Sequence, residues 1–353
     1  DPITPEDAPA SATVAAQPVP TAPRVIGYFT NWAHHRKAPC AFKTSDVRAE
    51  LFTHINYSFP GVKASADKES YELAPTSPED ETRLYAEVVA LKQKNPKLEV
   101  LLSVGGWAFN DKPTEWIFSA MSETPARRAS FIRHATDYLR RFGFDGLDID
   151  WEFPVAADRG GRPEDKANFT ALLRELRAHF REESAKSGRP ELKLTIAAPA
   201  GFLFYQNLEL DQIHEPLDWI NLMTYDYHGD WDKKTGANAP LIDQGADIEE
   251  SIAAYVAAGT PRGKLVLGFA TYARGFGGVE SATPGSPASL PGPEGPCGKD
   301  SLMVHHVADW VKSGRYQETW DVVTQTPYAY SKKEKAWITY ENTKSYGIKL
   351  DFL

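Results

Sequence analysis

The stretch "FDGLDIDWEFP", residues 144–154, decides the fold of this chain. Its acids Asp148, Asp150 and Glu152 alternate with large apolar residues, so in a β-strand they would share one face. Neighbours two apart lie about 6.6 Å apart along a strand, and three ionised carboxylates at that spacing would repel one another strongly inside a core. We therefore expect at least one of the three to hold a proton at neutral pH. A protonated carboxyl at the mouth of a pocket is what general acid catalysis needs.

Other interpretations of this acidic strand are a solvated strand end, carboxylates held by arginines, and a chelated divalent cation. The apolar residues between the acids, Leu147, Ile149 and Trp151, argue against an exposed strand. His54 and His228 are isolated in the sequence and give a metal site little support. We therefore expect neither a metal nor a cofactor.

Short apolar runs alternate with helical stretches from residue 24 onward, as expected of strands covered by helices. Seven strands, each followed by a crossover, fit an α/β fold of the (β/α)8 TIM barrel type better than a doubly wound sheet, whose G-x-G-x-x-G fingerprint is absent. In such a barrel the working residues sit at the C-terminal ends of the strands, and Glu152 is expected as the last residue of its strand. The strands are expected at 24–30, 51–59, 98–106, 144–152, 192–200, 217–225 and 264–273.

The helical stretches between these runs carry recognisable ends. The stretch 124–143 has Thr124 as its N-cap, Pro125 at its first helical position and Gly143 as its stop. The other helices are expected at 77–95, 166–188 and 246–259.

Residues 274–336 break the alternation and are predicted to form a small α+β insertion after strand seven. They hold a Gly/Pro/Ser-rich loop, a short helix-like stretch and most of a hairpin-like stretch, "YAYSKKEKAWITY" (328–340). Residues 24–273 would carry the first seven strands, and 337–353 would return to the barrel. We find no eighth strand, and a seven-stranded barrel leaves exposed edges. We therefore expect the native protein to continue beyond Leu353, or a second polypeptide to complete the barrel.

Composition excludes some classes of protein. The net charge of −9 argues against a nucleic acid partner, because phosphate binding needs a basic surface. No apolar run approaches the ~20 residues of a membrane helix. Residues 1–23 are rich in Pro and Ala and are predicted to be a disordered lead-in or linker; no signal peptide is visible there, so the chain is either a mature form or a cytosolic protein. Cys40 and Cys297 make either one bridge or two buried thiols.

An eight-residue signature and four supporting motifs together resemble one enzyme family. "DGLDIDWE" (145–152) matches the D-G-x-D-x-D-W-E signature of the family 18 glycoside hydrolases, the chitinases. The resemblance covers residues 24 to about 350 in order, and the "PYAY…WITYEN" stretch is similar to the end of the α+β insertion of one chitinase subgroup. The supporting motifs are "GYFTNW" (27–32), "SVGGW" (103–107), "MTYD" (223–226) and "YARGF" (272–276).

The resemblance implies substrate-assisted catalysis. Most glycosidases use two carboxylates, and this family is one of the exceptions. The 2-acetamido carbonyl of the sugar would attack the anomeric carbon, and water would open the resulting oxazolinium ion with retention. Glu152 would protonate the leaving oxygen and later activate water. Asp150 would turn between Asp148 and the acetamido N–H and share a proton with Asp148, and Tyr225 would hydrogen-bond the acetamido oxygen.

The resemblance also implies roles for the residues around these four. Asp226 would contact the sugar and tune Glu152, and Arg274 would bind sugar hydroxyls or, alternatively, pair with the insertion. The remaining candidates have plain packing as their alternative: Met223 beneath the site, Trp107 and Trp231 as stacking platforms on the leaving-group side, and Tyr28 and Ser103 as donors behind Asp148. The family's Trp at the end of strand eight has no counterpart here, and Trp337 cannot replace it because it lies in the last strand of the insertion.

The implied protein is a secreted, endo-acting chitinase that cleaves β-1,4 bonds between N-acetylglucosamine units of chitin or chito-oligosaccharides, and a monomer. One alternative is an endo-β-N-acetylglucosaminidase acting on N-glycans. Another is a non-catalytic chitin-binding lectin; such relatives typically lose the acid, whereas Glu152 is intact.

Overall fold

The computed structural model describes residues 23–243, 245–298 and 302–353. The predicted lead-in at 1–23 lies, apart from Pro23, outside the described residues.

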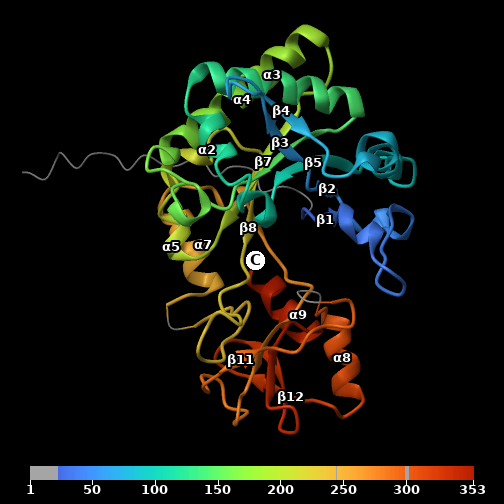
Figure 1. Ribbon diagram of the computed structural model, residues 1–353, viewed down its shortest axis with the longest axis vertical. Helices are drawn as coiled ribbons and strands as arrows, with labels where there is room; N and C mark the ends of the chain where they lie inside the picture. The colour runs from blue at the N-terminus through green and yellow to red at the C-terminus, as the bar shows by residue number, and fades with distance from the viewer. Residues whose placement is uncertain (1–22, 244, 299–301) are drawn as a thin grey trace, which may run out of the picture.

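A parallel sheet of seven strands forms the upper half of the molecule in Figure 1. Its order is β1-β2-β5-β6-β7-β8-β9, and every neighbouring pair is parallel. All seven predicted strands are present, and the predicted α/β class is confirmed. The strands are β1 (Ile26–Thr30), β2 (His54–Ser58), β5 (Glu99–Gly105), β6 (Gly146–Asp150), β7 (Lys193–Pro199), β8 (Trp219–Met223) and β9 (Leu265–Leu267).

The outer edges of β1 and β9 have no strand partner within the described part of the chain. The sheet is therefore a curled, seven-stranded partial barrel, and the closed eight-stranded barrel is not what the structure shows.

Several strands end one or more residues earlier than the sequence predicts, β6 and β9 among them. β6 ends at Asp150, so Glu152 is not the last residue of its strand but lies two residues beyond it. The reason is that the Glu152 carbonyl accepts a hydrogen bond from Arg159 Nε and is used by the following loop. β9 covers only the start of 264–273, because Thr224 Oγ1 bonds both the N–H and the carbonyl of Gly268 and replaces the strand ladder there.

Helices follow the strands, and their ends match local sequence signals. In α3 (Pro125–Phe142) the Thr124 side chain accepts from Arg127 N, and Gly143 takes the left-handed conformation with φ 77°, as predicted. The stretch at 77–95 is helical but divided into a π segment (Asp80–Leu84), α1 (Tyr85–Val89) and a 3-10 segment (Ala90–Gln93). The others are α2 (Ile117–Ser122), α4 (Asp165–Ser187), α5 (Phe202–Tyr205), α6 (Leu210–Ile213) and α7 (Ile248–Ala257).

The apolar face of β6 packs beneath these helices. Leu147, Ile149 and Trp151 are at most 1% exposed. The Trp151 ring stacks on Phe118 of α2 at 5.5 Å and meets Phe169 of α4 edge-on at 5.2 Å. This burial excludes the solvated-strand interpretation and turns the acids of β6 toward the inside of the curled sheet.

A second, antiparallel sheet occupies the lower half of Figure 1, together with α8 (Val304–Lys312) and α9 (Thr343–Phe352). The hairpin predicted within 328–340 is present as β13 and β14. The sheet runs on to Thr339, three residues past the predicted end of the insertion at 336, because β14 pairs with β10 up to that residue. Its strands, in the order β11-β10-β14-β13-β12, are β10 (Arg274–Gly277), β11 (Leu290–Pro291), β12 (Gln317–Asp321), β13 (Thr326–Ser331) and β14 (Ala336–Thr339).

Two further features complete the fold. β3 (Gly61–Ala64) and β4 (Tyr71–Ala74) form a small hairpin after β2. Trp337 is 2% exposed and packs between Phe276 and Tyr328 inside the antiparallel sheet, which is a structural position.

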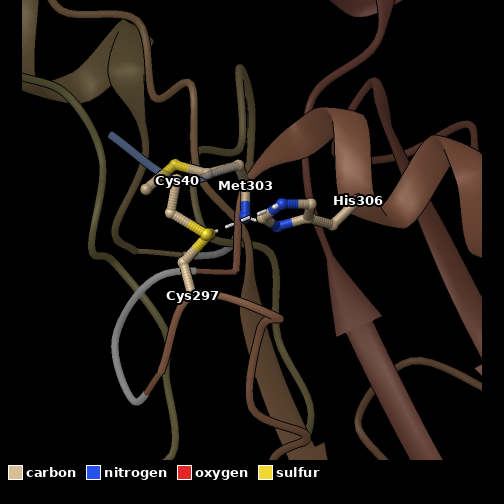
Figure 2. Close-up of a disulfide and its surroundings, with 4 residues drawn as sticks. All are labelled: Cys40, Cys297, Met303 and His306. Atoms are coloured by element: carbon tan, nitrogen blue, oxygen red, sulfur yellow. Dashed lines mark hydrogen bonds between the residues drawn. A yellow bond between two sulfur atoms is a disulfide. The ribbon is translucent and has the colours of Figure 1, made fainter. Parts of the chain in front are cut away.

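A disulfide joins the two cysteines and decides between the two alternatives left by the sequence. Cys40 lies after β1 and Cys297 after β11, with their Cα atoms 5.8 Å apart (Figure 2). The bridge therefore ties the loop region after β1 of the parallel sheet to the loop after β11 of the antiparallel sheet across 257 positions of sequence.

Among the described helices, none is long and apolar enough to cross a membrane.

Candidate active site

Asp148 lies at the centre of the curled sheet, completely buried, and accepts four hydrogen bonds. Neighbouring strands supply two of the donors, because Ser103 on β5 and Thr195 on β7 are its register partners. The four donors are Tyr28 OH (2.8 Å) and Ser103 Oγ (2.7 Å) to Oδ2, and Thr195 Oγ1 (2.5 Å) and Asn221 Nδ2 (3.1 Å) to Oδ1.

This pattern fills the acceptor capacity of Asp148. A carboxylate offers about four lone-pair positions, and each oxygen here has two donors. Burial raises the pKa of Asp148, and the donors oppose that rise by stabilising the charged form.

Asp150, the next acid on the same face, is almost without hydrogen bonds. It is 4% exposed, and its Oδ1 is buried with no partner among the described residues. Burial raises its pKa well above the ordinary value, and the negative charges of Glu152 and Asp148 raise it further. Asp150 is therefore the member of this pair that best holds a proton, and it has an oxygen free to meet a ligand.

Glu152 lies just beyond the strand end and is 8% exposed. Burial is the largest cause that raises the pKa of its carboxyl to about 7; the guanidinium of Arg159 lowers it and the charge of Asp226 raises it. A carboxyl that titrates near neutral pH can both give and take a proton there.

The end of β8 brings a second group of predicted residues together. Asp226 Oδ1 accepts from Tyr272 OH at 2.7 Å and from Arg274 Nε at 2.8 Å. The observed ion pair of Arg274 is therefore with Asp226. The ring of Tyr225 meets Tyr272 edge-on at 5.9 Å. Burial and the charges of Asp150, Asp226, Glu152 and Asp148 raise the pKa of Tyr225, so its hydroxyl stays a donor.

Two exposed indoles lie beside these acids. Trp107 follows β5 and is 57% exposed, and Trp231 follows β8 and is 55% exposed. Each has a guanidinium against its ring: Arg159 at 3.7 Å from Trp107, and Arg274 at 5.2 Å from Trp231. Their exposure leaves ring surface free for a ligand. Met223 is half-buried as the last residue of β8.

The structure adds residues that the sequence reasoning missed. Thr195 and Asn221 donate to Asp148, Tyr272 donates to Asp226, and Arg159 contacts both Glu152 and Trp107. A signal for two of them was present, since Asn221 is the single polar residue of β8 and Thr195 is the single polar residue of β7 after Lys193 at its start. Among the described residues, no group of three or more His, Cys, Asp or Glu side chains is arranged to hold a metal ion.

Comparison with known proteins places this geometry in a family. The model of glycosyl hydrolases family 18 matches residues 24–353. The chain belongs to this family. It is similar to chitotriosidase-1 of Mus musculus, with 37% identity over 346 residues that cover 94% of this chain and 70% of the relative.

Solved structures of this family share the fold. The Group IV chitinase of Ostrinia furnacalis, in complex with allosamidin, superposes with a TM-score of 0.82 at 28% identity and covers 93% of this chain and 87% of that one. Human YKL-39 superposes with a TM-score of 0.83 at 31% identity, covering 94% and 89%, and is described as a pseudo-chitinase with retained chitooligosaccharide binding. This family 18 chain therefore has both chitinases and a chitooligosaccharide-binding pseudo-chitinase among its relatives.

Proposed function

We propose that this family 18 protein is a chitinase that hydrolyses β-1,4 bonds between N-acetylglucosamine units with retention, through an oxazolinium intermediate. The observation that carries the proposal is Glu152, a nearly buried carboxyl with a pKa of about 7 beside Asp150. Glu152 gives its proton to the leaving oxygen and then takes one from the attacking water.

Asp150 and Tyr225 bind the acetamido group that performs the attack. The unpartnered Oδ1 of Asp150 accepts the acetamido N–H, and the Tyr225 hydroxyl donates to the acetamido oxygen. Asp148, which its four donors keep in place, supports Asp150 from behind and stabilises the positive charge that develops on the sugar.

The exposed aromatic side chains and the polar pair at the end of β8 bind the sugar chain. Trp107 and Trp231 stack on sugar rings on the leaving-group side, and Asp226 and Arg274 contact sugar hydroxyls. Met223 forms the apolar floor beneath the acetamido group.

The overall plan that accompanies this function is a barrel of the (β/α)8 type, of which this chain supplies seven strands, with an α+β insertion. We assign residues 24–273 to the barrel, 274–336 to the insertion, and 337–353 to a return toward the barrel. The insertion forms one wall of a groove long enough for several sugars, which favours endo cleavage. The disulfide fits a protein that matures in an oxidising compartment, and we propose that it is secreted as a monomer.

A chitooligosaccharide-binding lectin is the second candidate, because human YKL-39 is a pseudo-chitinase that retains binding. The intact acid favours hydrolysis.

Chitohexaose digestion tests the choice. We expect the wild type to release shorter oligosaccharides whose new reducing ends start as the β-anomer by proton NMR. Glu152→Gln should lose about 10²- to 10⁴-fold in kcat while calorimetry shows binding close to that of the wild type. An inverted product, or wild-type turnover in Glu152→Gln, contradicts the mechanism; binding without any cleavage by the wild type supports the lectin.

A further inference from the structure

Asp226 has a backbone conformation that needs outside support. Its φ is +60°, in the left-handed region that residues other than glycine rarely adopt. Such a conformation persists only where the surrounding structure holds it. The side chain of Asp226 is held by Tyr272 and Arg274, as described above, and its backbone N–H donates to Asn238 Oδ1 at 2.9 Å.

Asn238 holds this turn from a completely buried position. It is 1% exposed. Its side-chain oxygen accepts the N–H of Asp226, and its backbone carbonyl accepts the N–H of Tyr227 at 3.1 Å. Its own N–H donates to Thr339 Oγ1 of β14 at 2.8 Å. Asn238 therefore connects the turn after β8 with the antiparallel sheet.

Thr339 and Arg274 are register partners in the pairing of β14 with β10. One cross-strand pair thus supports both parts of Asp226: Arg274 binds its carboxylate directly, and Thr339 supports its backbone through Asn238. Ala239, which follows Asn238, is held as well, because the buried Lys349 of α9 donates to its carbonyl at 2.5 Å.

We propose that Asn238 and Thr339 are positioning residues for the proposed hydrolysis, which fix the backbone of Asp226 so that its carboxylate stays beside Glu152. The inference rests on the proposed function for its catalytic meaning. It makes the antiparallel sheet a part of the proton-transfer site as well as a wall of the groove.

The electrostatics of the site supply the readout. The charge of Asp226 raises the pKa of Glu152, and Arg159 lowers it. The other titratable groups that interact with Glu152 are Asp150 and Tyr225. If Thr339 loses its hydroxyl, Asn238 loses an anchor, the turn relaxes, and the Asp226 carboxylate moves away. The pKa of Glu152 should then fall, because a raising charge has moved.

A matched pair of variants tests the proposal: Thr339→Val removes the acceptor at constant shape, and Thr339→Ser keeps it. The measurement is a carbon-13 NMR titration of protein labelled at glutamate carboxyls, with the Glu152 signal assigned by its loss in Glu152→Gln. We expect Thr339→Val to lower the pKa of Glu152 by about 0.5–1 unit and Thr339→Ser to keep the wild-type titration. If Thr339→Val does not fold, Asn238→Ala, which removes the acceptor for Asp226 N–H, gives the same test.

Asp226→Asn decides whether the effect passes through Asp226. In that background the charge is gone, so Thr339→Val should produce no further shift. A Thr339→Val titration equal to that of the wild type overturns the proposal, as does a shift that persists in full beside Asp226→Asn. Because the titration needs no turnover, a wild type that cleaves no chitohexaose contradicts the proposed function and leaves the positioning role to be judged by NMR.

Discussion

The guanidinium of Arg159 lies 3.7 Å from the ring centroid of Trp107 and donates to the Trp107 carbonyl at 2.5 Å. The same guanidinium donates to the carbonyl of Glu152 at 2.8 Å and pairs with Asp111 at 2.9 Å. One buried side chain thus fixes the proposed sugar platform relative to the proposed acid. No motif in the sequence marked this residue.

Arg159→Met should loosen the position of Trp107 and change the pKa of Glu152. The buried carbonyl of Glu152 loses its donor, which costs about 1–3 kcal/mol in the free energy of unfolding, and the partly buried carbonyl of Trp107 loses one as well. Loss of the positive charge should raise the pKa of Glu152 and move the alkaline limb of the kcat profile to higher pH. Chemical denaturation and kcat measured across pH check both. Arg174→Met, which removes a surface arginine paired with Glu215, is the control and should leave the profile unchanged. An unmoved alkaline limb in Arg159→Met would show that Arg159 does not act on the acid.

Thr195→Val should expose the role of the donors around Asp148. The change leaves Oδ1 of a buried carboxylate with one donor fewer, which raises the pKa of Asp148 and costs about 1–3 kcal/mol in the free energy of unfolding. Because Asp148 supports Asp150, kcat should fall as well. Urea unfolding and chitohexaose kinetics measure both effects. Thr195→Ser keeps the hydroxyl and is the matched control; equal losses in the two variants would mean that the methyl group, and not the hydrogen bond, matters.

Glu152→Gln should make the protein more stable at alkaline pH. The pKa of Glu152 is raised from 4.5 unfolded to about 7 folded, so its contribution is complete below pH 4.5 and is lost as pH rises through 7. The loss amounts to about 3 kcal/mol, and the amide variant avoids it. Denaturation at pH 4 should find the two proteins alike, and at pH 8 should find the variant more stable. The exposed Glu249→Gln serves as control. A wild type that matches Glu152→Gln at pH 8 would contradict the raised pKa.

Reduction of the disulfide should lower the melting temperature. Cys40 and Cys297 close a loop of more than 250 residues, and loss of such a bridge costs about 2–5 kcal/mol. Thermal unfolding with and without dithiothreitol measures the effect in the wild type. The double variant Cys40→Ser with Cys297→Ser should melt like the reduced wild type and should not respond to dithiothreitol. A wild type that melts equally in both conditions would mean that the bridge adds no stability.

Local features of the fold could be predicted well from the sequence. Thr124, Pro125 and Gly143 act within a few residues of the helix they delimit, and α3 begins and ends where they indicate. The alternation in β6 likewise placed Asp148 and Asp150 on one face, because side chains in a strand alternate whatever surrounds it. The exact end of β6 could not be predicted, since the carbonyl of Glu152 just beyond it binds Arg159, which lies seven residues further on in a 3-10 segment (Ala157–Arg159).

The partners of the acids were the part that the sequence could not supply. Asp148 meets Tyr28 across 120 positions and Asn221 across 73, and Asn238 meets Thr339 across 101. Contacts at such separations follow from strand order and register, which no local pattern states.

The sequence by itself determined the type and order of the main elements, the inward-facing acids and the family resemblance, because these depend on neighbours along the chain. Only the tertiary structure decided the hydrogen-bond partners and neighbouring charges of each carboxyl. It gave Asp148 four donors, left Asp150 with a free oxygen, and set Glu152 between Arg159 and Asp226. The physical reason is that the pKa of a carboxyl depends on burial and on the charges and donors within a few ångströms, and folding alone brings those together.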